Sequence, residues 1–388
     1  MTATAPTFDP PHQGPVDLLV VAGEHSGDQH AARMVAELRA KQPGLNIAAL
    51  GGPELASVGA QLLYDLTASS VVGLVEVLRN YGFFKALFAE TLRWIEAHRP
   101  RAVCFVDYPG FNLRLARELQ ARRLSRKGGG TIRTLFYISP QIWAWKAGRR
   151  FSMAQHLDGM AVIFPFEVSC YADTTLRPEF VGHPFLAEGY RSPVEYDPSG
   201  PVLLLPGSRK QAVSRIFPVM LRGYEAAAER KAVVLYPSDA ILAVLKRFPV
   251  PDSVVFQPTP REGVSDQFEP VRASAVLTSS GTMSMHCALA GIPGVVVYRA
   301  NPMTYLLGKW LVKVPYLGIA NLLLEEAMYP EYIQGAATPA ALSRELRSCL
   351  DDPSRRDRTA ARAGKLRAIL RQPASGTAAD WLLRHLGS

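Results

Sequence analysis

The chain has 388 residues, of which 48% are hydrophobic and 20% charged, a composition that fills two domain cores and excludes a largely disordered protein. No apolar run reaches the roughly 18 residues that a membrane-spanning helix needs, so a spanning protein is excluded. The formal net charge is +9, and basic residues concentrate at 114–150 and 353–388. This charge favours an anionic partner, such as a phosphate-bearing substrate or an anionic membrane surface. Nucleic acid would rest on charge alone and is not expected.

The start of the chain and its cysteines indicate a cytoplasmic protein. Residues 1–15 contain four prolines and lack the basic n-region of a signal peptide, and the apolar run that follows is too short for its hydrophobic region. We expect a disordered tail here. The four cysteines lie far apart, with no CxxC pair and no histidine at metal-binding spacing, so we expect buried thiols in a reducing compartment. No metal site and no cofactor is expected.

Short apolar runs alternate with helical patterns along the whole chain. Strands that are nearly all apolar are typical of a parallel sheet buried on both faces, and their alternation with helices predicts doubly wound αβα domains. The expected strands are 18–22, 47–50, 102–106, 134–138, 160–163, 202–205, 233–236, 254–257, 275–278 and 294–298. The expected helices include 29–40, 83–98, 112–124, 214–230 and 283–290.

One interruption of this alternation marks a domain boundary. Residues 182–201 hold four prolines and three glycines and show no useful helical period. The fold class is therefore α/β, with two doubly wound αβα domains facing a cleft at the carboxyl ends of their strands. The expected parts are an N-terminal domain at 16–184, a linker at 185–200, a C-terminal domain at 201–352 and basic C-terminal helices at 353–388.

Two turns of the N-terminal domain carry a carboxylate directly after an apolar strand. Glu24 follows the first strand, and Asp107 follows the strand at 102–106. A carboxylate at this edge can act as a base or can accept a hydrogen bond from a substrate hydroxyl. In the first turn, Ser26 or Asp28 can instead cap the next helix, and Asp107 could be an ordinary turn cap.

Two turns of the C-terminal domain have the composition of a phosphate cradle. Gly207, Ser208 and Arg209 follow the strand at 202–205, where a helix start beside an arginine would attract an anion. The segment 279–282 repeats this pattern after the strand at 275–278. Together the two turns favour a nucleoside diphosphate. No carboxylate pair suited to Mg²⁺ accompanies them, so arginine and helix dipoles would stabilise the diphosphate.

An aromatic and basic segment follows the strand at 134–138. Trp143, Trp145 and Lys146 lie within SPQIWAWK, close to Arg149 and Arg150. These residues could be part core and part surface, or they could form the wall of a site for an amphiphile.

At these positions the chain resembles the lipid-A-disaccharide synthases, a family of glycosyltransferases with the GT-B fold. The resemblance covers about residues 16–340. Its motifs, in chain order, are AGEHSGD (22–28), VVGLVEVL (71–78), VDYPGFN (106–112), YISPQIWAWK (137–146), FPFE (164–167), VGHP (181–184), LLPGSR (204–209), SSGT (279–282) and NLL (321–323).

The resemblance implies a reaction and a set of site residues. It implies metal-independent, inverting transfer of diacylglucosamine from UDP to diacylglucosamine 1-phosphate, by a protein held peripherally at the inner membrane face. The catalytic candidates are Asp107 and Glu24. The UDP candidates are Gly207, Ser208, Arg209, Ser280, Gly281, Thr282 and His286. The acceptor and lipid candidates are Ser26, Asp28, Asn112, Trp143, Trp145, Lys146 and Asn321.

Three positions depart from the family pattern. Gly110 replaces an aspartate proposed as the family's base, His286 replaces a glutamate expected to hold ribose hydroxyls, and Ala187 replaces an aspartate. Since Gly110 cannot take a proton, the base is expected to be Asp107 or Glu24, and we favour Asp107. His286 could still donate a hydrogen bond to a ribose oxygen.

Two other functions remain open at this stage. One is a UDP-sugar 2-epimerase, which shares the two-domain fold and the UDP cradle but has no lipid to hold. The other is a non-catalytic protein that binds UDP-sugar or lipid, which the departures at Gly110 and His286 make credible. The apolar spacing at 71–95 fits an interfacial helix on a membrane or an ordinary core-facing helix. A homodimer is one expectation for the oligomeric state.

Overall fold

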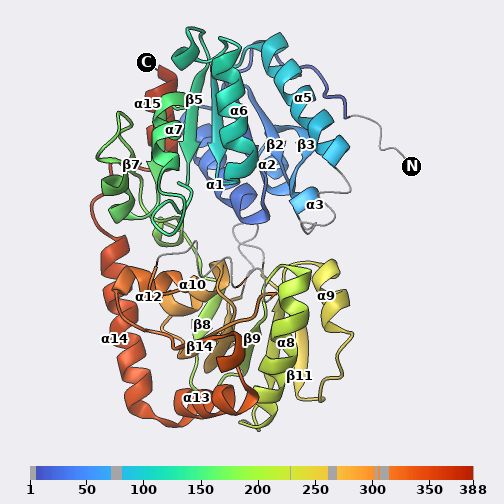
Figure 1. Cartoon of the computed structure of the whole chain (residues 1–388), viewed down its shortest axis with the longest axis vertical. Helices are drawn as coiled ribbons and strands as arrows, with labels where there is room; N and C mark the ends of the chain where they lie inside the picture. The colour runs from blue at the N-terminus through green and yellow to red at the C-terminus, as the bar shows by residue number, and fades with distance from the viewer. Residues whose placement is uncertain are drawn as a thin grey trace. The chain divides into compact units, whose positions relative to one another are not determined.

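The computed structural model describes residues 6–70, 81–227, 229–260, 269–301, 305 and 314–387. The chain forms two compact units, which Figure 1 shows with their elements labelled. Unit 1 comprises Met1–Pro184 and Gln372–Ser388, and unit 2 comprises Phe185–Arg371.

Unit 1 is built on a parallel sheet of seven described strands in the order β3-β2-β1-β4-β5-β6-β7. β1 and β4 are buried at every residue, as expected for strands covered by helices on both faces. The strands are β1 (Leu18–Ala22), β2 (Ile47–Gly51), β3 (Gln61–Asp65), β4 (Ala102–Val106), β5 (Arg133–Tyr137), β6 (Gly159–Val162) and β7 (Glu179–Phe180). The helices are α1 (His25–Lys41), α2 (Pro53–Ser57), α3 (Thr67–Ser70), α5 (Tyr81–His98), α6 (Pro109–Ala121), α7 (Arg149–His156) and α15 (Ala378–Gly387), with short 3₁₀ turns η1 (Arg126–Gly128) and η2 (Pro165–Tyr171).

Unit 2 repeats this design with six described strands in the order β11-β10-β9-β13-β14-β15, all parallel. Its strands are β9 (Val202–Leu205), β10 (Ala232–Tyr236), β11 (Val254–Pro258), β13 (Ala275–Thr278), β14 (Gly294–Tyr298) and β15 (Glu331–Ile333). Its helices are α8 (Lys210–Glu225), α9 (Asp239–Leu245), α10 (Thr282–Leu289), α12 (Ile319–Leu324), α13 (Pro339–Asp351) and α14 (Pro353–Leu370), with 3₁₀ turns η3 (Pro184–Leu186) and η4 (Gln334–Ala336). A separate parallel pair joins β8 (Val194–Tyr196) to β12 (Val271–Ala273).

These two doubly wound αβα units confirm the predicted fold class. Each sheet reverses its strand order once, at β1/β4 in unit 1 and at β9/β13 in unit 2. In such sheets the carboxyl ends of the strands at the reversal are where ligands bind.

The segments expected as linker and C-terminal helices differ in detail from the expectation. The segment at 185–200 contains β8, which pairs with β12. The segment at 353–388 divides between the units, because α14 packs on α10 and α12 whereas α15 packs on α1 and β6.

The apolar stripe of α5 faces the core of unit 1, which corrects the expectation of an interfacial helix for this part of 71–95. Leu87, Leu92 and Ile95 are buried in the cluster that also holds residues of β1 and β4. Residues 71–80 lie outside the described part of the chain. Within the described residues, no helix combines the length and apolar character needed to cross a bilayer.

Candidate functional site

The reversal point of unit 1 brings the two expected carboxylates to neighbouring strand ends. β1 and β4 are paired as far as their last residues, Ala22 and Val106. Glu24 and Asp107 therefore follow adjacent strands. Gly23 allows the close approach of their turns, because a Cβ there would lie 2.1 Å from the Tyr108 ring. Glu24 caps α1 by position only, since its side chain makes no capping hydrogen bond.

The turn after β4 is strained and firmly held. Asp107 and Tyr108 have φ values of +47° and +48°, a left-handed conformation that costs free energy in residues other than glycine. The Asp107 N–H donates to the Tyr137 carbonyl at 3.0 Å. The buried Asn112 amide donates to the Asp107 carbonyl at 2.7 Å and to the Val21 carbonyl at 3.3 Å. Asn112 therefore supports the backbone of this turn, and its acceptor-side role stays a prediction.

Burial raises the pKa of Asp107 to about 6, and the nearby Glu24 carboxylate acts in the same direction. A base works best when its pKa lies near the working pH, because it is then ionised and still able to take a proton. A carboxyl group in this environment is suited to taking up a proton, whereas a turn cap would not need a raised pKa.

Asp28 does not cap its own helix and is not presented to a ligand. Its side chain is fully buried and accepts hydrogen bonds from the backbone N–H groups of Gly52 (2.8 Å), Glu54 (3.0 Å) and Leu55 (3.4 Å). Burial raises its pKa, and these bonds oppose the shift. Asp28 therefore holds the start of α2 to α1, and its acceptor-side role stays a prediction. Ser26 lies half-buried in the first turn of α1.

The reversal point of unit 2 brings the two expected phosphate turns together. The Ser279 N–H donates to the Leu205 carbonyl at 2.8 Å, joining the turn after β13 to the turn after β9. Gly207 has φ +107°, and a Cβ there would lie 2.9 Å from Ser279 Oγ. Only glycine fits this left-handed, crowded position.

Two helices begin at this edge of the sheet. α8 starts after Arg209 and α10 starts after Gly281. Ser208, Arg209, Gly281 and Thr282 are exposed, and Ser280 is half-buried. The N–H groups at two helix starts, with Arg209 directly before α8, form an arrangement that can hold an anion.

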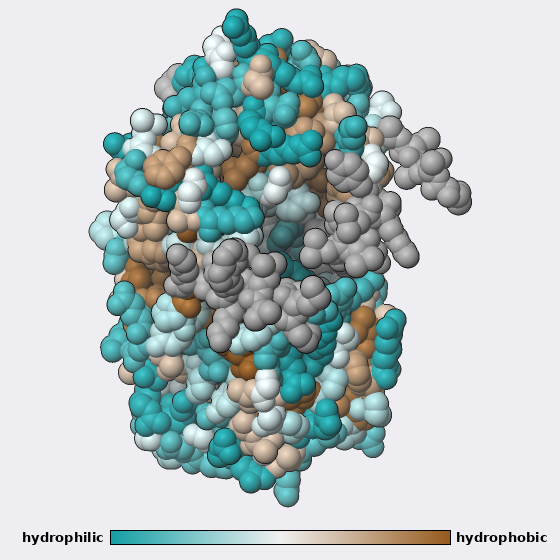
Figure 2. All heavy atoms as spheres, viewed as in Figure 1, coloured by the Kyte–Doolittle hydropathy of each residue, from teal (hydrophilic) through white to brown (hydrophobic). Residues whose placement is uncertain are grey.

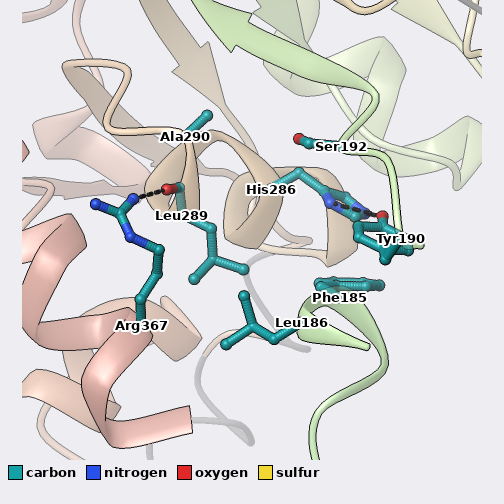
Figure 3. A pocket seen from close by; sticks show the side chains of 8 residues that line it. All are labelled: Phe185, Leu186, Tyr190, Ser192, His286, Leu289, Ala290 and Arg367. Atoms are coloured by element: carbon teal, nitrogen blue, oxygen red, sulfur yellow. Dashed lines mark hydrogen bonds between the residues drawn. The ribbon is translucent and has the colours of Figure 1, made fainter. Parts of the chain in front are cut away.

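His286 is not presented with these residues. It is 1% exposed, its ring centroid lies 3.8 Å from that of Phe185, and its ring nitrogens lie 3.1 and 3.3 Å from Tyr190 Oη. Figure 3 shows His286 beside these aromatic rings, at a cavity of about 180 Å³. Arg367 borders the same cavity and donates to the Leu289 carbonyl. The His286 ring is thus enclosed by residues of the 185–192 segment, and its ribose contact stays a prediction.

Asn321 is also enclosed. It is 1% exposed, its amide donates to the Tyr329 carbonyl at 2.7 Å and to Glu331 Oε1 at 2.9 Å, and its oxygen accepts from the Tyr329 N–H at 3.0 Å. These bonds hold α12 to Tyr329 and to the first residue of β15, and the acceptor-side role of Asn321 stays a prediction.

The aromatic segment after β5 divides between interior and surface. Trp143 is half-buried, and its indole Nε1 donates to Glu167 Oε1 at 3.2 Å. Trp145 is 37% exposed, with the Lys146 ammonium 4.6 Å and the Arg149 guanidinium 5.0 Å from its ring centroid. The segment is therefore part core and part surface, and the wall of a site for an amphiphile stays a prediction.

Glu167 is a further buried carboxyl group of unit 1, which the sequence analysis named only within the FPFE motif. It is 1% exposed in η2, which follows β6, and burial raises its pKa to about 8, with the negative charge of Asp107 acting in the same direction. The available signal was a carboxylate three residues after the apolar run at 160–164. Among the described residues, no group of three or more His, Cys, Asp or Glu side chains is arranged to hold a metal ion.

Known proteins resemble this chain over most of its length. A family model described as lipid-A-disaccharide synthetase matches residues 18–381. The lipid-A-disaccharide synthase of Geobacter metallireducens is 34% identical over 366 residues, covering 91% of this chain and 92% of that protein. The synthase of Geobacter sulfurreducens is 35% identical over 361 residues, covering 89% and 90%.

Solved structures of low sequence identity share the fold. A putative UDP-N-acetylglucosamine 2-epimerase from Listeria monocytogenes aligns with a TM-score of 0.61 at 13% identity, covering 97% of both chains. The calicheamicin glycosyltransferase CalG4 aligns with a TM-score of 0.55 at 16% identity, covering 96% of this chain and 98% of that one.

Proposed function

The chain belongs to the lipid-A-disaccharide synthetase family, and we propose that it transfers 2,3-diacylglucosamine from UDP to 2,3-diacylglucosamine 1-phosphate, with inversion at the anomeric carbon and without a metal ion. The products are the lipid A disaccharide 1-phosphate and UDP. The observation that supports the proposal is that two carboxylates follow adjacent strands at the strand-order reversal of one sheet, and two helices begin beside Arg209 and Gly281 at the reversal of the other.

The carboxylates of unit 1 are assigned to the acceptor. Asp107 is the base that removes the proton of the attacking hydroxyl, and its raised pKa of about 6 supports this role. Glu24 follows the adjacent strand and orients the acceptor sugar. Trp145 and Lys146 offer apolar and cationic contacts for the acylated, phosphorylated acceptor.

The helix starts of unit 2 are assigned to UDP. Charge develops on the diphosphate as the glycosidic bond breaks, and N–H groups already aimed at that position stabilise it. Ser208, Arg209, Ser280, Gly281 and Thr282 surround the starts of α8 and α10. Arg209 supplies the positive charge that a metal ion provides in other transferases.

A UDP-sugar 2-epimerase is the weaker alternative. The Listeria monocytogenes structure supports only the fold, because its identity is 13%. The family match covers residues 18–381 and favours the transferase. A non-catalytic binding protein would keep the UDP site and lose turnover, so an activity assay separates it from the enzyme.

Peripheral attachment to an anionic membrane surface is part of the proposal. Four of the five exposed large apolar side chains in the described residues fall between 145 and 168 in unit 1. Cations stand beside two of them, since Arg150 lies 4.3 Å from the Phe151 ring centroid and two cations flank Trp145. Exposed aromatic residues with adjacent Lys and Arg suit the interface of an anionic bilayer. We define the aromatic-basic surface as Trp145, Phe151, Phe166 and Val168 with Lys146, Arg149 and Arg150.

One assay tests the reaction itself. The purified protein is incubated with UDP-2,3-diacylglucosamine and 2,3-diacylglucosamine 1-phosphate, and UDP and disaccharide are followed by mass spectrometry. Equal amounts of both products are expected. UDP binding without product would favour the non-catalytic reading, and conversion of the donor sugar without an acceptor would favour the epimerase.

A further inference from the structure

Two turns of unit 1, one after β5 and one after β6, are fastened to each other by a buried carboxyl group. Glu167 Oε1 accepts from the Trp143 indole at 3.2 Å, and Oε2 accepts from the Phe164 N–H at 3.2 Å. Trp143 belongs to the first turn, whereas Phe164 and Glu167 belong to the second. A carboxyl group that is 1% exposed is costly to bury unless its oxygens are bonded, so this arrangement needs both donors.

Two more contacts join the same turns. Ser139 Oγ and Tyr171 Oη are 2.7 Å apart, and both residues are buried. The Trp143 and Phe166 rings meet edge to face, with centroids 5.5 Å apart. Such contacts fix the orientation of the aromatic rings as well as their separation. The two turns therefore form one rigid piece.

This piece lies next to the turn that carries Asp107. The Asp107 N–H donates to the Tyr137 carbonyl at 3.0 Å, immediately before the turn that contains Trp143. Glu167 is also close enough for the charge of Asp107 to raise its pKa. With pKa values of about 6 for Asp107 and about 8 for Glu167, Asp107 is ionised near neutral pH and Glu167 is not. Glu167 thus holds Trp143 without placing a second buried negative charge beside Asp107.

We propose that Glu167 is a positioning residue of the acceptor site, which holds the Trp143 indole and thereby fixes the turn at 139–146 beside Asp107. The inference rests on the proposed transferase function and adds a residue to it. Glu167 acts through Trp143, so the two side chains work as a unit and their losses do not multiply.

The test is a double-mutant cycle with Glu167→Ala, Trp143→Phe and the double variant, together with Glu167→Gln. Each single loss is expected to lower kcat by about 10- to 100-fold, the effect of a misplaced wall beside the reacting groups. The KM for the UDP donor is expected to stay unchanged, because the donor residues belong to unit 2. Glu167→Gln keeps an acceptor oxygen for the indole and should restore most of the activity lost in Glu167→Ala.

Asp158→Ala is the matched control. The Asp158 carboxylate accepts from the Thr134 N–H at 2.8 Å and from Thr134 Oγ1 at 3.1 Å, at the amino end of β5. It therefore fastens the same strand at the edge away from Asp107. This variant should lower the Tm without lowering kcat.

The indole N–H signal of Trp143 in ¹H–¹⁵N NMR gives a readout that does not depend on turnover. The signal is identified by its absence in Trp143→Phe, and it should move and exchange faster in Glu167→Ala. A double variant no worse than the worse single variant, within about threefold, supports the proposal. Losses that multiply, or a folded Glu167→Ala with normal kcat, overturn it.

Two further outcomes are also decisive. If Glu167→Ala does not fold, Trp143→Phe and Glu167→Gln decide, and normal kcat in Trp143→Phe overturns the proposal. A wild-type protein that makes no disaccharide overturns the proposed function, and an unchanged indole signal in Glu167→Ala separately overturns the link between Glu167 and Trp143.

Discussion

Gly23 and Tyr108 are packed so closely that a β-carbon on Gly23 would lie 2.1 Å from Cδ1 of the tyrosine ring. The contact joins the turns after β1 and β4, whose strands pair side by side up to Ala22 and Val106. It keeps Glu24 near Asp107, whose pKa is raised mainly by burial and further by the Glu24 charge. The left-handed backbone at Asp107 and Tyr108 is the cost of this arrangement, and strain of this kind gathers at functional sites.

Asp107→Asn is expected to lower kcat by about 10² to 10⁴, because the amide cannot take the proton of the acceptor hydroxyl. UDP affinity should stay at the wild-type value, since the UDP residues belong to unit 2. Steady-state kinetics and calorimetry with UDP measure the two effects. Glu24→Gln is the comparison variant, and it should raise the KM for the acceptor more than it lowers kcat. Near-normal turnover in Asp107→Asn would make Asp107 a turn cap and move the base elsewhere.

The activity should rise with pH through about 6, because burial and Glu24 raise the pKa of Asp107 to that value and only the ionised form is a base. Stability should change in the opposite direction. Between the ordinary value of 3.8 and about 6 the native state binds more protons than the unfolded state, so the free energy of unfolding falls as pH rises. Asp107→Asn should therefore be more stable than the wild type at pH 7 but not at pH 4. Chemical denaturation at both pH values measures this difference, and an equal effect at both would contradict the assignment.

The strands and the position of the site could be predicted because they depend on local patterns. β1 and β4 consist entirely of apolar residues and are buried throughout, and a parallel sheet places their following residues at one edge. By contrast, β3 has mixed residues that are all half-buried, and β7 has only two residues. Neither carries a pattern that separates a strand from a loop.

The roles of the buried polar side chains could not be predicted, because their partners are distant in the sequence. Asn112 bonds to the Val21 carbonyl and Asp28 bonds to the N–H of Gly52. His286 is covered by Phe185 and Tyr190, which belong to a segment expected as linker. A motif in the sequence can place such a residue near the site. Only its tertiary contacts show whether the side chain faces a ligand or supports the backbone.

Arg209→Ala is expected to weaken UDP binding by about 1.5–3 kcal/mol, the range for a hydrogen bond to a charged group. Arg209 is exposed at the start of α8, where its charge and the helix dipole act on the same anion. The matched control is Arg222→Ala, which removes the same exposed charge from the last turn of α8. Calorimetry should find unchanged UDP affinity in the control. Equal losses of UDP affinity in both variants would show that Arg209 acts only through the net charge of the protein.

Turnover should persist in excess EDTA, because the proposed diphosphate site relies on Arg209 and two helix starts rather than on a cation. The assay for UDP release is run with EDTA, and then with Mg²⁺ or Mn²⁺ added back. The Arg209→Ala variant provides an internal comparison, since a metal that replaced the missing charge would restore part of its activity. Loss of wild-type turnover in EDTA, with recovery on adding a metal, would show that a cation stabilises the leaving group.

Membrane attachment should depend on the aromatic-basic surface and on salt. Figure 2 shows an exterior that is largely hydrophilic on the face in view, with apolar groups scattered over it. Phe151 is 47% exposed, and inserting its ring into a bilayer interface would remove apolar surface from contact with water. Phe151→Ser should therefore weaken sedimentation with anionic vesicles by about fivefold or more.

Replacing Lys146 and Arg149 by glutamine should weaken membrane binding by about 1 kcal/mol for each charge removed, and it should flatten the dependence of binding on NaCl. Val255→Ser is the matched control, because Val255 is 51% exposed in unit 2 and lies outside this surface. Equal weakening in Val255→Ser, or binding that is indifferent to NaCl and equally strong on neutral vesicles, would contradict an electrostatic contact through these residues.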